Sequence, residues 1–256
     1  MTAGTSPGEG ILDRALAVLS CFTEDDPELG AGELAAHTGL ASSTLHRLLA
    51  ALVQRGMLVR LPGQRYAVGA RLWELGELSP LSLRLRERAI PHMVRLYEAT
   101  GENVHLAVLD GDDPAAASAI YVGRVTGRMS IPTVSRAGGR GPLHTTGVGR
   151  ALLAAQEEPW LVRYFAVPRE RETRFSITAE GPLRRELTRT RERGYALTQE
   201  EMTLGNISVA VALPPVAGLP PIALGLVVTL ERADERRLAA IVQQTARELL
   251  QDLRAG

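Results

Sequence analysis

The stretch that decides the fold of the first part of the chain spans residues 32–52, GELAAHTGLASSTLHRLLAAL. Four leucines of its second half recur at i, i+3, i+4 and i+7, namely Leu45, Leu48, Leu49 and Leu52. This spacing places them on one face of a helix. The first half predicts a shorter helix ending at Gly39, because glycine readily takes the positive φ of a tight turn. Two short helices joined in this way form a helix-turn-helix.

The opposite face of the second helix is polar, with Ser43 and Arg47 on it and His46 at its edge. Residues 34–73 contain five arginines and no acidic residue, a net charge of +5, whereas residues 1–33 contain one arginine and seven acidic residues, a net charge of −6. A surface of one sign is typical of proteins that contact phosphate. We therefore interpret the motif as a DNA-binding element rather than as a purely structural helical hairpin.

A β-hairpin is predicted directly after this motif, at residues 56–69. Two short apolar runs flank the turn residues Pro62 and Gly63 there, which is the usual sequence pattern of a hairpin. A β-hairpin directly after a helix-turn-helix is typically the wing of a winged helix-turn-helix domain. Arg60 and Arg65 flank its tip, where they could reach phosphate or the minor groove. The alternative, that they only solvate the tip, fits the position of the wing less well.

Composition excludes several classes of protein. No apolar run approaches the ~20 residues of a membrane span, so we expect no membrane partner. The single cysteine, Cys21, excludes an internal disulfide framework and a Cys-x-x-Cys metal site, which fits a cytoplasmic protein. All 29 basic residues are arginine, which excludes phosphate-loop and Schiff-base chemistry, since both need lysine.

The pattern divides the chain into four segments. We expect a flexible lead at 1–10, a winged helix-turn-helix domain at 11–69, a linker helix at 70–80, and an effector-binding and oligomerisation domain at 81–256. An amphipathic helix at 12–22 should bury Leu12 and Leu16. The further helices are predicted at 81–100, 148–156, 159–165, 180–193 and 233–253, and the further strands at 104–109, 119–125, 129–134, 195–198, 208–213 and 222–230. The fold class is therefore α+β, with an antiparallel sheet flanked by helices in the last segment.

Four blocks of the sequence resemble IclR-type transcriptional regulators. They are GLASSTLHRLL at 39–49, RYAVG at 65–69 with Leu72, Leu75 and Gly76, PLHTTGVGRALL at 142–153, and RGYA at 193–196 with Glu200 and Glu201. The resemblance extends from about residue 12 to 253. It implies a winged helix-turn-helix, a linker helix and a GAF-like ligand-binding domain. It also implies a homodimer or a dimer of dimers on double-stranded DNA with a palindromic operator, and repression is the commoner action in that family.

Side-chain chemistry assigns roles at the DNA end. Arg47 can bond guanine O6 and N7 bidentately, and a good pair of this kind contributes roughly 1 to 3 kcal/mol of discrimination. Ser43 and His46 can bond base edges or phosphate. Ser42 and Thr44 are expected to anchor phosphate near the helix start.

The helix predicted from 148 begins with backbone N–H groups that suit a carboxylate. The resemblance implies that the effector lies there, against residues of the later strands. The positions carried over are Gly147, Val148, Thr198, Ser208, Val227 and Thr229. The family commonly has an acidic residue near Thr198, a cysteine at Ser208 and a serine at Val227. Fewer polar groups here favour an aromatic or otherwise apolar acid over a very small hydrophilic one such as glyoxylate.

Three other functions remain open from the sequence. An enzyme is disfavoured, because the chain has no His-Glu-x-x-His motif and no Gly-x-Gly-x-x-Gly motif, and Gly-x-Ser-x-Gly occurs only at residues 4–8, where no strand precedes it. A sensor of metal or cofactor is disfavoured by the scattered histidines, so we expect no cofactor. His144 is interpreted as a structural loop histidine. A pure oligomerisation module would be favoured by a filled cavity beside Gly147.

Overall fold

A computed structural model describes residues 10–23, 25–126 and 136–255. The chain divides into two compact units, residues 1–79 and residues 80–256. The strand expected at 129–134 and most of the lead at 1–10 lie outside the described residues. Among the residues described, no helix combines the length and apolar character needed to cross a membrane.

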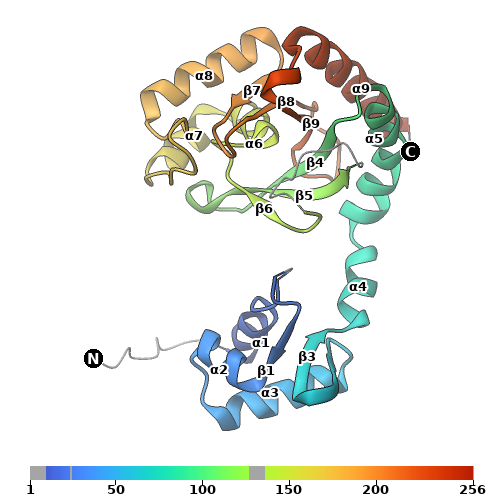
Figure 1. Cartoon of the computed structure of the whole chain (residues 1–256), viewed down its shortest axis with the longest axis vertical. Helices are drawn as coiled ribbons and strands as arrows, with labels where there is room; N and C mark the ends of the chain where they lie inside the picture. The colour runs from blue at the N-terminus through green and yellow to red at the C-terminus, as the bar shows by residue number, and fades with distance from the viewer. Residues whose placement is uncertain (1–9, 24, 127–135, 256) are drawn as a thin grey trace. The chain divides into compact units, whose positions relative to one another are not determined.

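The first unit is a helical domain with a small sheet (Figure 1). Its helices are α1 (Ile11–Leu19), α2 (Ala31–Thr38), α3 (Ser42–Gln54) and α4 (Ala70–Glu77). Its strands are β1 (Glu28–Gly30), β2 (Leu58–Arg60) and β3 (Arg65–Val68), which pair antiparallel in the order β1-β3-β2. Gly39 ends α2 with φ 67°, so the predicted turn is confirmed. The four leucines of α3 are all buried against α2 and the hairpin.

Two expectations for this unit are wrong. The first helix ends at Leu19 instead of residue 22, and it buries Val18 while Leu12 and Leu16 are 69% and 53% exposed. Apolar residues occur on every side of this helix, so its sequence alone does not determine which face is buried. The end of the acidic segment before α2 forms β1, for which no strand was predicted, and β1 pairs with β3 of the hairpin. On α4, Trp73 is 69% exposed.

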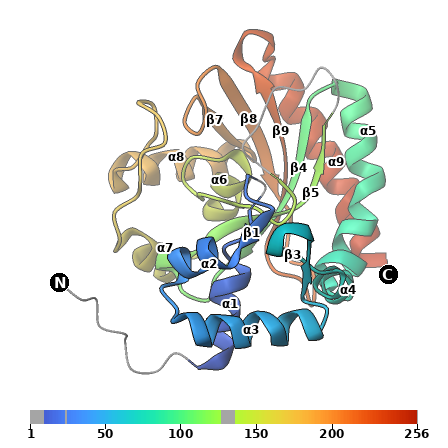
Figure 2. The same ribbon diagram turned by 60° about the horizontal axis from the view of Figure 1, so that its bottom comes forward.

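The second unit is built on one sheet of antiparallel strands in the order β6-β5-β4-β9-β8-β7 (Figure 2). The strands are β4 (Asn103–Asp110), β5 (Ser118–Val125), β6 (Arg140–Gly141), β7 (Ala196–Gln199), β8 (Asn206–Ala212) and β9 (Ile222–Thr229). The helices are α5 (Glu87–Thr100), α6 (Gly147–Ala154), α7 (Glu158–Phe165), α8 (Glu180–Arg193) and α9 (Glu235–Ala255). A π-helical segment, Leu81–Arg86, precedes α5, so the helix expected at 81–100 is not uniform. The edge strand β6 had no sequence signal.

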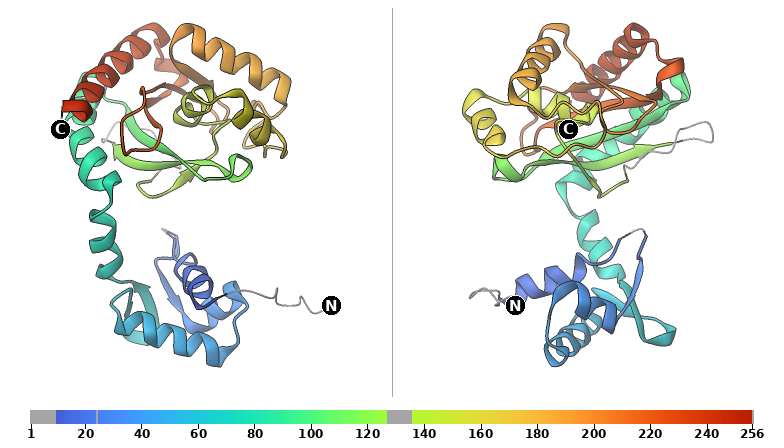
Figure 3. Two further views of the ribbon diagram at one scale, coloured as in Figure 1. Left: turned by 180° about the vertical axis from the view of Figure 1, so that it is seen from behind. Right: turned by 60° about the vertical axis from the view of Figure 1, so that its left-hand side comes forward.

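Alternation along the strands sorts side chains onto the two faces of this sheet. Val104, Leu106 and Val108 of β4 face the core that includes α5 and α9, whereas Ala107 belongs to the core around α6. Helices α5 and α9 lie side by side on the first face (Figures 1 and 3). On the α6 face the central strands carry small residues, including Gly225. A Cβ there would approach Ala210 Cβ to 2.7 Å.

Candidate functional site

Helix α3 presents the predicted DNA-reading residues. It begins at Ser42, so Ser42, Ser43 and Thr44 form its first turn, where backbone N–H groups are not used within the helix. Ser42, Ser43, His46 and Arg47 are exposed, and Thr44 is half-buried. The structure therefore leaves this set available on one element, opposite the buried leucines.

A groove of about 630 Å³ lies between α3 and the hairpin. It is lined by Ala31, His46, Ala50, Val53, Gln54, Arg60, Gln64 and Tyr66. His46 and Arg60 were predicted, whereas the two glutamines were not. Gln64 has φ 63° and follows Gly63 with φ 73°, a rare conformation for a residue with a side chain. The hairpin tip is thus held in a specific shape beside α3.

Arg65 is engaged within the protein. Its guanidinium lies 3.3 Å from a carboxylate oxygen of Glu33 and 3.9 Å from one of Glu28, and it also donates to the Glu28 carbonyl. All three residues are close to half exposed, so water screens these pairs. A DNA phosphate would have to compete with both carboxylates for Arg65, while Arg60 is exposed.

The second unit holds a cavity of about 70 Å³ at the start of α6. Five of the six predicted effector residues line it: Gly147, Val148, Thr198, Ser208 and Val227. The sheet register explains why distant positions meet, because Thr198 pairs with Ser208 and Ser208 pairs with Val227 across β7, β8 and β9. Thr229 is outside the lining. It pairs with Asn206 two residues further along β9 and accepts a hydrogen bond from Arg232 at 3.5 Å.

The start of α6 forms one wall of this cavity. Thr146 caps the helix: its Oγ1 accepts from the Gly149 N–H at 3.1 Å and donates to the Pro142 carbonyl at 2.7 Å. Within the described part of the chain, the N–H groups of Gly147 and Val148 find no acceptor, although both residues are buried. A Cβ at Gly147 would overlap Ser208 Oγ, so glycine is what lets the helix start approach the sheet. Buried, unpaired N–H groups at a helix start favour an anionic ligand.

Further lining residues were missed by the sequence. They are His105, Tyr121, Arg140, Gly141, Thr145, Thr146, Glu200, Glu201, Met202, Thr203, Asn206 and Ile207. Most of them come from β4, β5 and the two loops that precede α6 and follow β7. Only the pairing of strands, which the sequence does not specify, brings these segments to one place.

His105 and Tyr121 give the cavity an aromatic wall. Their rings meet edge to face with centroids 5.3 Å apart. Burial, together with the nearby Arg124 guanidinium, lowers the pKa of His105 to about 3, so its imidazole is neutral at physiological pH. Burial also raises the pKa of the Tyr121 phenol. This uncharged aromatic wall is suited to pack against the ring of an aromatic ligand.

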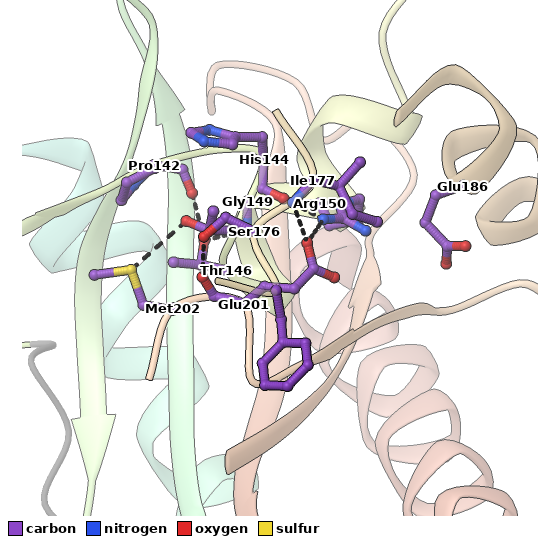
Figure 4. Close-up of polar contacts among 12 residues, drawn as sticks. Pro142, His144, Thr146, Gly149, Arg150, Ser176, Ile177, Glu186, Glu201 and Met202 are labelled. Atoms are coloured by element: carbon purple, nitrogen blue, oxygen red, sulfur yellow. Dashed lines mark hydrogen bonds and ion pairs between the residues drawn. The ribbon is translucent and has the colours of Figure 1, made fainter. Parts of the chain in front are cut away.

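Glu201, which lines the cavity, forms a buried ion pair with Arg150, which lies outside the lining (Figure 4). Arg150 Nη2 is 2.5 Å from Glu201 Oε2, and Arg150 Nε donates to the His144 carbonyl at 3.0 Å. Burial raises the pKa of Glu201, and Arg150 opposes that rise. His144 itself is buried and bonds the Glu170 carbonyl at 2.8 Å, in keeping with a structural loop residue.

The described residues limit other chemistries. No group of three or more His, Cys, Asp or Glu side chains among them could hold a metal ion. A filled site beside Gly147 would have favoured a pure oligomerisation module. The space beside Gly147 is instead open. It is lined by Gly147 and Val148, whose N–H groups have no acceptor among the described residues, which favours a ligand-binding domain.

Comparison with known proteins gives consistent matches over most of the chain. Residues 11–62 match the family model "IclR helix-turn-helix domain", and residues 80–251 match "Bacterial transcriptional regulator IclR C-terminal". The HTH-type transcriptional regulator XynR of Escherichia coli (strain K12) is 31% identical over 235 residues, which covers 91% of each chain. The transcriptional repressor IclR of the same organism is 32% identical over 219 residues, covering 82% of this chain and 77% of the relative.

One solved structure is similar over nearly the full length. It is an IclR homolog from Microbacterium hydrocarbonoxydans complexed with 4-hydroxybenzoate. The TM-score is 0.88 at 28% sequence identity, and the match covers 96% of this chain and all of the other.

Proposed function

Because the chain belongs to the IclR family of bacterial transcriptional regulators, we propose that it is a sequence-specific repressor controlled by a small organic acid. The acid binds in the cavity at the start of α6, and its binding changes the affinity for operator DNA. The observation that carries this proposal is that the cavity is lined by Gly147 and Val148, two buried residues whose N–H groups at the start of α6 have no acceptor among the described residues.

The chemistry of the lining supports an aromatic acid. The carboxylate accepts hydrogen bonds from the start of α6, while Ser208, whose hydroxyl donates to the Leu226 carbonyl at 2.8 Å, can accept one from a ligand. The ring lies against His105 and Tyr121, with Val227 nearby. A relative of the same fold is complexed with 4-hydroxybenzoate, an acid of this class. We therefore take 4-hydroxybenzoate as the first probe.

At the DNA end, Arg47 reads a guanine in the major groove, and the other exposed residues of α3 hold the helix in place. The groove beside α3 takes the sugar-phosphate backbone, and Arg60 contacts a phosphate from the hairpin. A palindromic operator requires two copies of the chain. The exposed apolar side chains of α1 and α4, including Leu12, Leu16 and Trp73, support a homodimer, which can pair further into a tetramer.

Control follows from a difference in ligand affinity between two arrangements of the DNA-binding domains. The effector shifts operator binding only as far as it prefers one arrangement. The segment 70–100 joins the two units and transmits this preference. An enzyme with a fused DNA-binding domain is the weaker alternative, since the relatives are transcriptional regulators.

The test begins with selection of bound duplexes from a random DNA pool at about physiological salt, where non-specific binding is weak. A palindromic consensus supports the regulator, and the same duplex then reports whether 4-hydroxybenzoate changes operator affinity. An Arg47→Ala variant should keep its fold and lose preference at one base pair of each half-site. If the folded variant selects the same consensus as the wild type, the assignment of α3 as the reading helix is wrong.

If no sequence is enriched with or without the acid, the repressor proposal is overturned. If a consensus appears but aromatic acids leave operator affinity unchanged, the DNA-binding part stands and the acid part does not. A ligand-independent DNA-binding oligomer is then the better description.

A further inference from the structure

The ion pair between Arg150 and Glu201 lies at the junction of four chain segments. The Arg150 side chain has no exposed surface and that of Glu201 is 7% exposed. Arg150 extends from the first turns of α6 to the carbonyl of His144, in the segment that precedes the helix. The Glu201 carboxylate also accepts from the Ile177 N–H at 3.3 Å. Figure 4 shows the Arg150 guanidinium between the His144 carbonyl and the Glu201 carboxylate.

The backbone around Glu201 is fixed by the same neighbourhood. Ser176 Oγ donates to the Glu201 carbonyl at 2.7 Å, and Thr173 Oγ1 donates to the Glu200 carbonyl at 2.6 Å. Glu200 has φ 54°, a conformation that persists only where the surroundings enforce it. The loop 200–205 therefore leaves β7 in a shape that its own sequence does not favour.

Two of the segments tied together here also line the effector cavity. Thr145 and Thr146 come from the segment before α6, and Met202 and Thr203 come from the loop after β7. Arg150 hydrogen-bonds both segments, through His144 and Glu201. Thr145 Oγ1 adds one direct link between them, a longer and weaker hydrogen bond to Met202 Sδ at 3.6 Å. Arg150 acts on the cavity from behind, because it is not itself part of the lining.

Stability alone does not account for such a pair. Moving two charges out of water costs about as much as their attraction returns, and apolar replacements of buried pairs are often neutral or stabilising. Here Arg150 Nη1 also has no hydrogen-bond partner among the described residues, which adds to the cost. What the pair does supply is a single arrangement of two loops and a balance of charge.

The charge balance matters because Glu201 lines the cavity in which an anion is expected. A carboxylate ligand beside an unpaired Glu201 would be repelled, and in a buried site this repulsion is weakly screened. Arg150 offsets that charge at contact distance. Without Arg150, binding an anion at the start of α6 would carry the added cost of facing, or of first protonating, the buried Glu201 carboxylate.

We propose that Arg150 is a positioning and charge-compensating residue of the effector site: it fixes the loop 200–205 against the segment before α6 and neutralises Glu201, so that an anionic ligand can be held. This inference rests on the proposed function for the identity of the ligand, but the positioning part does not depend on it. The two parts are tested by separate measurements.

Positioning is tested without ligand, by hydrogen–deuterium exchange on the full-length protein. Arg150→Met and Glu201→Gln should raise exchange rates about tenfold or more in peptides covering 142–149 and 200–205, while β8 and β9 keep wild-type protection. The matched control is Arg163→Met, which removes an exposed arginine paired with Asp113 at 3.0 Å and should change neither peptide. Unchanged exchange in both loops, or a uniform rise through the sheet, would overturn the positioning role.

A further variant guards against loss of folding. Arg150→Met combined with Glu201→Leu removes both buried charges and should fold at least as well as the wild type. The two loops should still exchange faster than in the wild type. Wild-type protection in this double variant would mean that the ion pair does not position them.

Charge compensation is tested by comparing 4-hydroxybenzoate with its neutral amide, 4-hydroxybenzamide. The ratio of their two dissociation constants should shift about fivefold or more towards the amide in Arg150→Met and towards the acid in Glu201→Gln. Combining Arg150→Met with Glu201→Gln should bring the ratio back to within about twofold of wild type. A merely structural role would weaken both ligands equally, so an unchanged ratio overturns the compensation. If the wild type binds neither compound, the acid-effector proposal fails, and the exchange data alone decide the positioning role.

Discussion

His105 is buried in the second unit as a neutral imidazole, and this burial lowers the stability of the folded protein at low pH. Because its pKa in the folded protein is about 3, below the ordinary value of 6.5, the unfolded chain binds the proton more readily. The stabilisation is thus fully present above pH 6.5 and is lost as the pH falls from 6.5 towards 3. Between pH 7 and pH 5 the loss should be about 2 kcal/mol, since one pKa unit corresponds to about 1.4 kcal/mol.

Urea unfolding of the wild type and of His105→Gln at both pH values measures this contribution. The variant should be less stable at pH 7 and should lose about 2 kcal/mol less on acidification, because glutamine does not titrate. An equal loss in both proteins would mean that other groups carry the acid sensitivity.

Gly147 is a second residue whose immediate neighbours determine what can stand at its position. A methyl group there would overlap Ser208, so Gly147→Ala must push the start of α6 away from the sheet and displace its N–H groups. We expect binding of 4-hydroxybenzoate to weaken by tenfold or more, measured by calorimetry. Adding Ser208→Gly removes the overlapping atoms and should recover part of that loss.

Gly181→Ala is the matched control, because its new Cβ would lie 3.7 Å from the nearest atom, the end of the Arg185 side chain. It should leave ligand binding unchanged. If Gly147→Ala binds the probe as tightly as this control does, the ligand does not lie against the start of α6.

At the scale of elements, the hairpin β2–β3 gives different environments to two arginines that look equivalent in the sequence. Arg60 is exposed, whereas Arg65 is held by Glu28 and Glu33. A phosphate contact releases counterions, and losing one lowers the salt dependence of DNA affinity by about 0.9 in the log–log slope. We expect this change for Arg60→Ala and a smaller one for Arg65→Ala, measured by titrating operator DNA at several salt concentrations. Equal slopes for the two variants would contradict this distinction.

Elements also differ in how well a sequence predicts them. Helix α8 has the predicted bounds, because Leu183 and Leu187 mark its buried side and Gly194 ends it with φ 76°. Strand β1 was not predicted, because a strand of three residues is too short to show the alternation of apolar and polar side chains. The candidate effector site depends on pairings between strands far apart in the chain. The resemblance therefore gave five lining positions, while local patterns gave neither His105 nor Tyr121.

At the scale of the whole molecule, the exposed apolar side chains of α1 predict self-association. Combining Leu12→Glu with Leu16→Glu should shift the protein towards monomer in sedimentation velocity at micromolar concentration, because charge replaces apolar surface that a second copy would cover. Operator affinity should fall with it, since a palindrome needs two copies.

Val162→Glu is the control for this prediction. Val162 is 56% exposed on α7, and its replacement should leave the oligomeric state unchanged. A wild type that sediments as a monomer in the presence of its operator would rule out the homodimer.

Each compact unit contains one of the two tryptophans of the chain. Trp73 is largely exposed on α4, and Trp160 stacks on Tyr164 in α7 with ring centroids 5.7 Å apart. The protein thus contains two tryptophan fluorophores in different surroundings, and single Trp→Phe replacements separate their emission when excitation is at wavelengths that tyrosine does not absorb. In a Trp160→Phe protein, tryptophan fluorescence reports on α4 alone. In a Trp73→Phe protein, it reports on the second unit alone. Events in the two units can therefore be timed separately in one unlabelled chain.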